Sequence, residues 1–252
     1  MAKLEALLFD VDGTLADTER DGHRLAFNQA FKKFGLDWDW SVPLYGELLA
    51  VTGGKERIRY FLNQHRPDVS LEDGFIAELH AVKTGFYTEM LRQGAIPLRP
   101  GVERLIHEAR TQGIRLAIAT TTTMENVEAL IHHTLGHDAI SWFEVIGAGD
   151  VVPHKKPAPD IYFYAMEQLG LGANQCLAFE DSENGIHATR DAGLTTVITV
   201  NDYTREHNFN GAALVLDQFG EPDSPFQVLQ GDAGQHSFFD LRLAFEIHDK
   251  EQ

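Results

Sequence analysis

Length, composition and charge restrict the class of protein. The chain has 252 residues, 43% hydrophobic and 23% charged, which is the balance of a globular protein and not of a disordered chain. This length can hold one large domain or a core domain with a smaller insertion. The net charge of −17, from 21 basic and 38 acidic residues, argues against a nucleic-acid partner, because binding a phosphate backbone requires a basic surface.

Several further features bear on location and partners. No segment approaches the length of a membrane span, so no membrane partner is expected. The N-terminus runs into a short apolar stretch that ends in acidic residues, unlike a signal peptide, which predicts a cytoplasmic protein. The single cysteine, Cys176, lies in an apolar run, where we expect a buried, unreactive thiol. We expect a monomer, although no sequence feature specifies the oligomeric state.

The first apolar run, residues 5–9, predicts a short strand that leads into the sequence DVDGT. Residues 17–91 then contain amphipathic stretches typical of helices and no clear strand pattern. This change of pattern predicts an inserted helical cap domain at 17–91, with a core domain made of residues 1–16 and 92–252.

From residue 98 onward, helical patterns alternate with short runs rich in valine, isoleucine, leucine and alanine. Such alternation indicates crossover units and a parallel sheet with helices on both faces. The fold class is therefore predicted to be α/β, doubly wound. The expected strands are 5–9, 115–120, 144–148, 176–180 and 195–200. No pattern in the last thirty or so residues, from about Gly220, suggests a function.

Polar side chains follow the predicted strands, and ligands of open parallel sheets bind at that edge. Asp10 and Asp12 are two residues apart at the end of the first strand, so an extended chain places them on the same side. Two close carboxylates favour a cation, and Mg²⁺ prefers such oxygen ligands. An ordinary Asp-Gly turn is the alternative interpretation of this segment.

Three further strand ends contribute candidates. Glu180 and Asp181 add two carboxylates for a cation. Lys156 precedes a proline and can neutralise the oxygens of a transferring phosphoryl group, although a solvated lysine would have the same sequence. Thr120 and Thr121 begin a run of four threonines that can bind phosphate, cap the following helix, or do both.

These segments, in this order, resemble the four motifs of the haloacid dehalogenase superfamily of phosphohydrolases. The resemblance spans nearly the whole chain and implies a magnesium-dependent phosphoryl transfer. It implies that Asp10 is the nucleophile, Asp12 the general acid and base, Thr120 a phosphate donor and Lys156 the orienting cation. The implied magnesium ligands are Asp10, the backbone carbonyl of Asp12, and Asp181, with Glu180 as a ligand or outer-sphere partner.

The predicted cap contains a group of basic residues that can supply local cations in an acidic protein, namely Lys55, Arg57, Arg59 and Arg66. Gly53 and Gly54 would let backbone N–H groups approach an anion. A solvated helix face explains some of these charges, and Arg59 is the first candidate for that role.

Several segments together resemble the CbbY-type phosphatases of the Calvin cycle: DVDGTLADTE, TGGKER, HAVKT (residues 80–84) and NDYTRE. That family hydrolyses xylulose 1,5-bisphosphate, an inhibitory by-product of rubisco, to xylulose 5-phosphate. The resemblance implies a sugar bisphosphate substrate whose second phosphate binds in the cap. The implied substrate-binding residues are Glu19, His23, Tyr45, Thr52, Gly53, Gly54, Lys55, Arg57, Lys83 and Thr121. For His23, a packed structural histidine is an equal alternative.

Three other functions remain open at this stage. A β-phosphoglucomutase-like enzyme on the same fold would return the phosphoryl group to another hydroxyl of the sugar. A phosphatase for another small phosphomonoester, such as phosphoglycolate, would share the same core motifs. A signalling receiver also carries a phospho-aspartate on a doubly wound sheet, but receivers are smaller and lack a helical insertion.

Overall fold

A computed structural model describes residues 3–51 and 53–250 of the chain. The chain forms two compact units, and each is described by itself. The core unit comprises Met1–Asp17 and Pro97–Gln252, and the cap unit comprises Thr18–Ile96. The sequence analysis places the corresponding boundaries at 16/17 and 91/92, so the second differs by five residues, because the chain after helix α4 still belongs to the cap unit.

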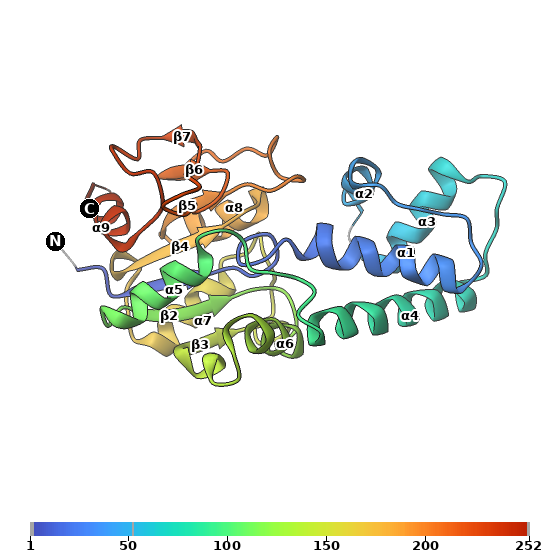
Figure 1. The fold of residues 1–252 in the computed structure, drawn as a ribbon, viewed down its shortest axis with the longest axis horizontal. Helices are drawn as coiled ribbons and strands as arrows, with labels where there is room; N and C mark the ends of the chain where they lie inside the picture. The colour runs from blue at the N-terminus through green and yellow to red at the C-terminus, as the bar shows by residue number, and fades with distance from the viewer. Residues whose placement is uncertain (1–2, 52, 251–252) are drawn as a thin grey trace. The chain divides into compact units, whose positions relative to one another are not determined.

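The core unit is built on a seven-stranded sheet with the order β3-β2-β1-β4-β5-β6-β7 (Figure 1). The first six strands in chain order pair in parallel, and β7 is antiparallel to β6. The predicted α/β class is confirmed, and each of the five predicted strands is present to within one residue at either end. The strands are β1 (Ala6–Phe9), β2 (Arg115–Ala119), β3 (Phe143–Gly147), β4 (Cys176–Glu180), β5 (Thr195–Thr199), β6 (Leu214–Leu216) and β7 (Val228–Gly231).

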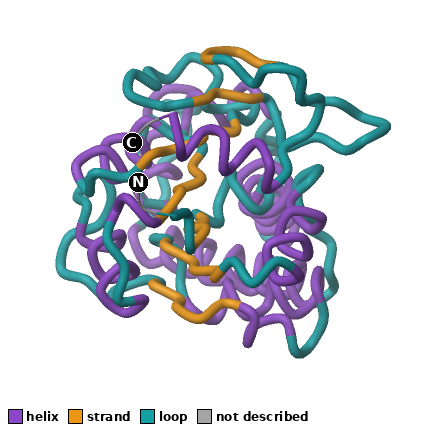
Figure 2. The backbone as a smooth tube through the Cα atoms, turned by 90° about the vertical axis from the view of Figure 1, so that its left-hand side faces the viewer, coloured by secondary structure: helices purple, strands orange, loops and turns teal. Residues whose placement is uncertain are grey.

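Helices cover both faces of this sheet, and Figure 2 shows the strands between them. Alternate strand residues point to opposite faces, which explains why the central strands are apolar throughout. Ala6, Leu8 and Ala178 pack with α7 and α8 in one core cluster. Phe9 and Phe179 stack with ring centroids 4.7 Å apart and belong to the other face. The core helices are α5 (Val102–Thr111), α6 (Met124–Leu135), α7 (Asp160–Leu169), α8 (Glu183–Asp191) and α9 (Leu241–Lys250).

The C-terminal segment, which the sequence patterns left unassigned, completes the core. It forms β7 and the amphipathic helix α9, whose Leu241, Ala244 and Ile247 are buried. Phe239, just before α9, contacts Phe179 edge to face at 5.3 Å. The segment therefore packs against one face of the sheet.

The cap unit consists of helices, and no strand is assigned among its described residues. Its elements are the π-helical turn η1 (Thr18–His23), α1 (Arg24–Lys33), α2 (Val42–Leu48), α3 (Gly54–His65) and α4 (Asp73–Arg92). Helix α1 lies along α4, and an aromatic cluster fills the space between helices. In that cluster Phe27 and Phe31 of α1 contact Trp40, with ring centroids 4.6 and 4.8 Å away.

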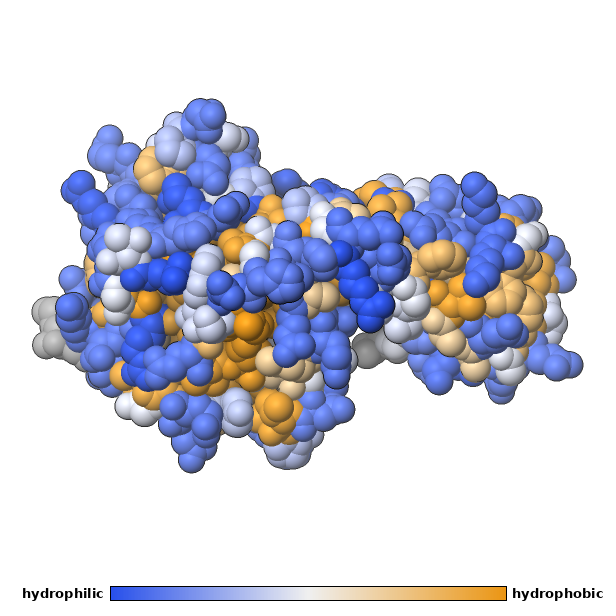
Figure 3. Space-filling model, turned by 60° about the horizontal axis from the view of Figure 1, so that its bottom comes forward, coloured by the Kyte–Doolittle hydropathy of each residue, from blue (hydrophilic) through white to orange (hydrophobic). Residues whose placement is uncertain are grey.

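Hydrophilic residues cover most of the face shown in Figure 3, and the apolar residues that reach it form separate patches. Within the described residues, no helix combines the length and the hydrophobicity that a membrane crossing requires.

Candidate active site

The sheet topology brings chemically active side chains to one edge. Strand β1 lies between β2 and β4, all three parallel, so their carboxyl ends meet at the same edge. Asp10 directly follows β1, Thr120 follows β2, and Glu180 ends β4. The strand order reverses direction at this point, because β2 lies on one side of β1 and β4 on the other, and such a switch point is where open α/β sheets bind ligands.

Three carboxylates form a buried cluster at this edge. One oxygen each of Asp10, Glu180 and Asp181 lies within 4.8 Å of the others, and all three residues are buried. Burial raises the pKa of Asp181 well above its usual value, and the neighbouring Asp10 and Glu180 add to that shift. Burial likewise raises the pKa of Glu180 to about 7, against the opposing effect of Lys156. The cluster therefore requires positive charge to hold its carboxylates ionised.

Lys156 supplies part of that charge. Its buried ammonium lies 2.7 Å from Asp10 Oδ1 and 2.6 Å from Glu180 Oε1, and it donates to the Ala119 carbonyl at 2.8 Å. Burial lowers the pKa of Lys156, but the two carboxylates outweigh burial and raise it. Lys156 is therefore a permanent cation in contact with the predicted nucleophile, whereas Lys155 is half exposed and pairs with Asp150.

Two glycines allow the chain to approach these carboxylates. Gly13 has φ +92°, and a Cβ there would lie 2.3 Å from Asp181 Oδ2. At Gly185, in the first turn of α8, a Cβ would lie 2.0 Å from Glu180 Oε2. Glycine is thus required at position 13 by both its backbone conformation and its surroundings.

The other predicted core residues lie on the loops around the cluster. Asp12 follows β1 in the turn that ends at Ala16, and its carboxylate is not a member of the three-carboxylate cluster. Thr120 is buried, and its backbone N–H donates to the Gly147 carbonyl. Thr121 is exposed, while Thr123 caps α6 by accepting from the Asn126 N–H at 3.4 Å, so the capping interpretation holds for part of the threonine run.

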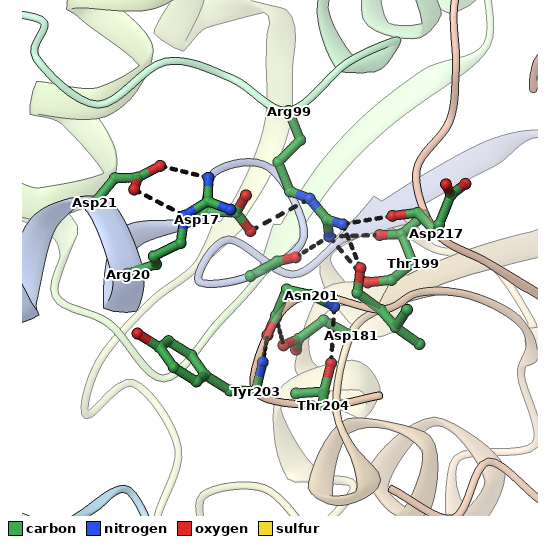
Figure 4. A network of polar contacts seen from close by, with 12 residues as sticks. Asp17, Arg20, Asp21, Arg99, Asp181, Thr199, Asn201, Tyr203, Thr204 and Asp217 are labelled. Carbon is green, nitrogen blue, oxygen red and sulfur yellow. Dashed lines mark hydrogen bonds and ion pairs between the residues drawn. The ribbon is translucent and has the colours of Figure 1, made fainter. Parts of the chain in front are cut away.

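Sequence reasoning assigned no role to three residues at this site. Tyr162 of α7 donates a hydrogen bond to Glu180, and Asn201, after β5, donates to Asp181 Oδ2 at 2.7 Å. Arg99 donates to the Gly13 carbonyl, and Figure 4 shows its side chain above Asp181 and Asn201. The position of Asn201 at a strand end was an available signal, whereas nothing in the sequence distinguishes Tyr162 or Arg99 from ordinary helix and linker residues.

The donor set fits a hard divalent cation. It offers oxygen atoms of three buried carboxylates, and the raised pKa values of Asp181 and Glu180 show that the one lysine does not neutralise them. Mg²⁺ prefers such oxygen ligands and is held by one or two carboxylates together with substrate phosphate. Asp10 and Asp181, with Glu180 as a further partner, are the side chains that would hold it.

A second polar cluster lies inside the cap unit. Tyr45 of α2 donates to Glu19 Oε2 at 2.6 Å and accepts from Arg57 at 2.7 Å. Burial by itself would raise the pKa of Glu19. The opposing effects of His23, Arg57, Tyr45 and Lys83 are larger together, so the pKa of Glu19 is lowered. Arg57 Nε is one of the buried side-chain atoms that have no hydrogen-bond partner within the described part of the chain. An unpaired buried guanidinium N–H fits an anionic ligand.

Lys83 and His23 extend this cluster. The Lys83 ammonium donates to His23 Nδ1 at 2.6 Å and lies 4.9 Å from the Phe27 ring centroid. His23 stacks on Tyr87 with centroids 3.8 Å apart. Burial and Lys83 lower the pKa of His23 to about 3, so its imidazole is neutral and accepts from the lysine. His23 is thus both packed in the structure and part of the polar cluster.

The remaining predicted cap residues separate into two groups. Gly53, with φ +93°, precedes α3, and Gly54 and the exposed Lys55 begin the helix. Arg59 pairs with Asp73 at 2.8 Å, and Arg66 with Asp37 at 2.9 Å, so these two cations already have surface partners. The prediction for Thr52 lies outside the described residues.

Comparisons with known proteins show which family this chain is similar to. A family model for the haloacid dehalogenase-like hydrolases matches residues 4–193. The plasmid-encoded protein CbbY of Cupriavidus necator is 47% identical over 94% of this chain and 94% of its own length. Protein CbbY of Rhodobacter capsulatus is 51% identical over 83% of this chain and 91% of its own length.

A solved structure shows the same likeness. The crystal structure of a CbbY mutant from Rhodobacter sphaeroides in complex with xylulose 1,5-bisphosphate matches with a TM-score of 0.73 and 47% identity. It covers 86% of this chain and 96% of that one. A second CbbY structure from the same organism, in complex with phosphate, matches with 48% identity.

Proposed function

The chain belongs to the haloacid dehalogenase-like hydrolases, and we propose that it is a magnesium-dependent phosphatase that converts xylulose 1,5-bisphosphate to xylulose 5-phosphate. The observation that carries the proposal is the buried Asp10, held by Lys156 beside two further carboxylates. It occurs in a chain 47% identical to a CbbY protein crystallised with that bisphosphate.

The proposed reaction has two steps. An Asp10 carboxylate oxygen attacks the phosphorus, the bond from phosphorus to the sugar oxygen breaks, and Asp12 gives its proton to the leaving alkoxide. Water then attacks the phosphorus of the aspartyl phosphate, Asp12 takes a proton from that water, and Asp10 leaves as a carboxylate. Bound Mg²⁺ would supply charge neutralisation for the nucleophile and the transferring phosphoryl group.

Lys156, on the loop between β3 and α7, and Thr120, directly after β2, serve the same reaction. The ammonium of Lys156 is already 2.7 Å from Asp10, so it orients the nucleophile and balances the negative charge that arrives with the substrate. Thr120 lies buried at the end of β2, where its hydroxyl is assigned to donate to a phosphoryl oxygen. We assign a contact with the substrate to Thr121, the residue next to Thr120.

The cap cluster is proposed to recognise the rest of the substrate. Arg57 has a buried Nε without a partner, and Lys83 is a second buried cation, so the two can receive the distal phosphate. Glu19, His23 and Tyr45 hold these cations and can accept from or donate to sugar hydroxyls. The backbone around Gly53 and Gly54, with Thr52 and Lys55, is assigned to the same phosphate.

A panel of substrates tests this proposal. Inorganic phosphate release is measured with xylulose 1,5-bisphosphate, ribulose 1,5-bisphosphate, phosphoglycolate and glucose 1-phosphate, each with Mg²⁺ and with a chelator. We expect the highest kcat/KM for xylulose 1,5-bisphosphate, one phosphate released per substrate, and no turnover with the chelator. A higher kcat/KM for phosphoglycolate would contradict the substrate assignment. Conversion of glucose 1-phosphate to glucose 6-phosphate that depends on a bisphosphate primer would instead identify a mutase.

We further infer that the protein acts as a monomer in the cytoplasm, where a phosphorylated sugar substrate would be found. Light scattering on purified protein measures the mass in solution, and the expected value is the 28.2 kDa of one chain. A mass of twice that value would contradict the monomer.

A further inference from the structure

Arg99 is a buried cation that the proposed catalytic roles do not use. It lies on the segment that joins helix α4 to helix α5, and 7% of its side chain is exposed. Its guanidinium donates to the carbonyl oxygens of Gly13, Thr199, Val200 and Asp217, and its Nε lies 3.4 Å from Asp17 Oδ1. Figure 4 shows this side chain between the turn after β1 and the segments after β5 and β6.

Two of the segments that Arg99 binds, the turn after β1 and the segment after β5, contact Asp181. Gly13 comes directly after Asp12, and its backbone approaches the Asp181 carboxylate so closely that a Cβ would lie 2.3 Å from it. Val200 comes directly before Asn201, whose amide donates to Asp181 Oδ2 at 2.7 Å. One guanidinium therefore fixes the distance between the turn that carries Asp12 and the segment that orients Asp181.

Arginine suits this position for geometric reasons. Its five donors form a rigid planar fork, so it can bind several carbonyl groups at once, whereas a lysine ammonium cannot hold the same fixed arrangement. The backbone N–H of Arg99 also donates to the Leu15 carbonyl at 2.8 Å, so the linker before the cap and the linker after it are paired directly. Arg99 thus binds the turn after β1 twice, through its guanidinium at Gly13 and through its backbone N–H at Leu15.

We propose that Arg99 is a positioning residue for phosphoryl transfer: it holds the Asp12–Gly13 turn against the end of β5 and thereby fixes Asp181 for the cation and Asp12 for the leaving group. Arg99 itself touches neither the substrate nor the cation. The predicted effect of Arg99 on kcat rests on the proposed phosphatase reaction. Its predicted effect on Mg²⁺ binding rests on the acidic cluster alone.

A purely structural role is the competing explanation, and Arg104 provides a matched control. Arg104 is also a partly buried arginine of the core unit that donates to the Gly220 and Phe239 carbonyls and pairs with Glu221 at 2.8 Å. Its partners belong to the C-terminal segment and to none of the loops around Asp181. Loss of either arginine should lower stability, but only loss of Arg99 should alter the site.

The test compares Arg99→Met, Arg99→Lys and Arg104→Met in the full chain. For each we measure Tm, the Mg²⁺ dissociation constant fitted to the rise of Tm with Mg²⁺ concentration, and kcat and KM for xylulose 1,5-bisphosphate. We expect Arg99→Met to lower kcat about 10- to 100-fold, with KM changed less than about threefold, because the reacting groups are displaced while substrate contacts remain. Its Mg²⁺ dissociation constant should rise about tenfold.

The other two variants decide the interpretation. Arg104→Met should lower Tm without changing kcat or the Mg²⁺ dissociation constant, and Arg99→Lys should fall between Arg99→Met and the unaltered protein. If Arg99→Met does not fold, Arg99→Lys is used in its place. It should then show a lower kcat and weaker Mg²⁺ binding than the unaltered protein. Unchanged kcat and Mg²⁺ response in the folded Arg99 variants, or equal changes in Arg104→Met, would overturn the proposal. Failure of the unaltered protein to release phosphate would refute the proposed function, and the Mg²⁺-induced rise in Tm would still test Arg99.

Discussion

At the scale of single residues, the site is governed by the cost of burying charge. Asp10, Glu180 and Asp181 are almost fully buried, and Lys156 contacts the first two. Isolated carboxylates in such surroundings would bind protons instead of remaining ionised. A lysine and a divalent cation together can keep Asp10 negative, which a nucleophile requires, while reducing its repulsion of phosphate.

Replacement of Asp10 by asparagine tests the nucleophile. Asp10→Asn keeps the shape of the side chain but cannot attack phosphorus as a carboxylate does, so kcat should fall by roughly 10³-fold or more. Phosphate release and circular dichroism are measured on the variant and on Asp150→Asn, whose carboxylate is 92% exposed. Substantial turnover by a folded Asp10→Asn protein would place the nucleophile elsewhere.

Arg57 and Arg59 provide a matched pair on helix α3. Arg57→Ala removes a buried guanidinium whose Nε is unpaired, so kcat/KM for a sugar bisphosphate should fall about 10- to 100-fold, as expected for lost hydrogen bonds to a charged group. The loss for a sugar monophosphate should be much smaller. Arg59→Ala, which removes only surface ion pairs with Asp73 and Glu56, should leave both values unchanged. Equal losses on the two substrates would contradict a distal phosphate site at Arg57.

At the scale of elements, short turns at helix and strand ends position the functional groups. The π-helical turn η1 comes before α1 and carries Glu19 and His23, while α4 carries Lys83 on the helix packed against α1. π-Helical turns are rare and occur frequently at functional sites. The sequence pattern is typical of an ordinary helix here. The structure instead has a π-helical turn at Glu19 and His23, whose side chains belong to the cap cluster.

The partly buried, neutral His23 should make the protein sensitive to acid. Its pKa is about 3 in the folded protein and about 6.5 when unfolded, so the unfolded chain binds an extra proton as the pH falls between these values. Stability from this group is complete above about pH 6.5 and is lost towards pH 3. Between pH 7 and pH 4 the unfolding free energy should fall about 2 kcal/mol more in the unaltered protein than in His23→Gln, allowing for its partial exposure.

Guanidinium denaturation at several pH values measures this difference. His107→Gln, an exposed substitution in the core unit, serves as the control and should follow the unaltered protein. Parallel pH curves for His23→Gln and the unaltered protein would show that His23 is not held neutral by the fold.

At the scale of the whole molecule, an acidic protein binds an anion through local cations. The net charge is −17, yet Lys156 in the core unit and Arg57 and Lys83 in the cap unit are buried cations. Low-dielectric surroundings strengthen the field of these few charges, whereas surface charges are screened by salt. A net negative charge that argues against a nucleic-acid partner is thus compatible with binding of a small phosphate ester.

Magnesium should stabilise the entire chain if the acidic cluster binds it. A cation present at about 100 times its dissociation constant adds about 2.7 kcal/mol to the unfolding free energy, which raises Tm. Asp181→Asn should abolish this rise, and without metal its Tm should be equal to or above that of the unaltered protein, because a buried like charge is removed. Thermal unfolding with and without Mg²⁺ measures both effects, and Asp191→Asn on the exposed end of α8 is the control. An undiminished rise in Asp181→Asn would remove Asp181 from the cation site.

The sequence by itself determined the α/β class, the five strands that carry the motifs, and the polar residues at their ends. These features follow from local patterns, because apolar runs form strands and parallel strands bring their carboxyl ends together. Only the tertiary structure decided which charges meet: Lys156 with Glu180, Arg57 with Tyr45, Arg59 with Asp73, and Arg99 with four carbonyl groups. Such pairings join residues 12 to 118 positions apart, and their geometry depends on packing that no local pattern encodes.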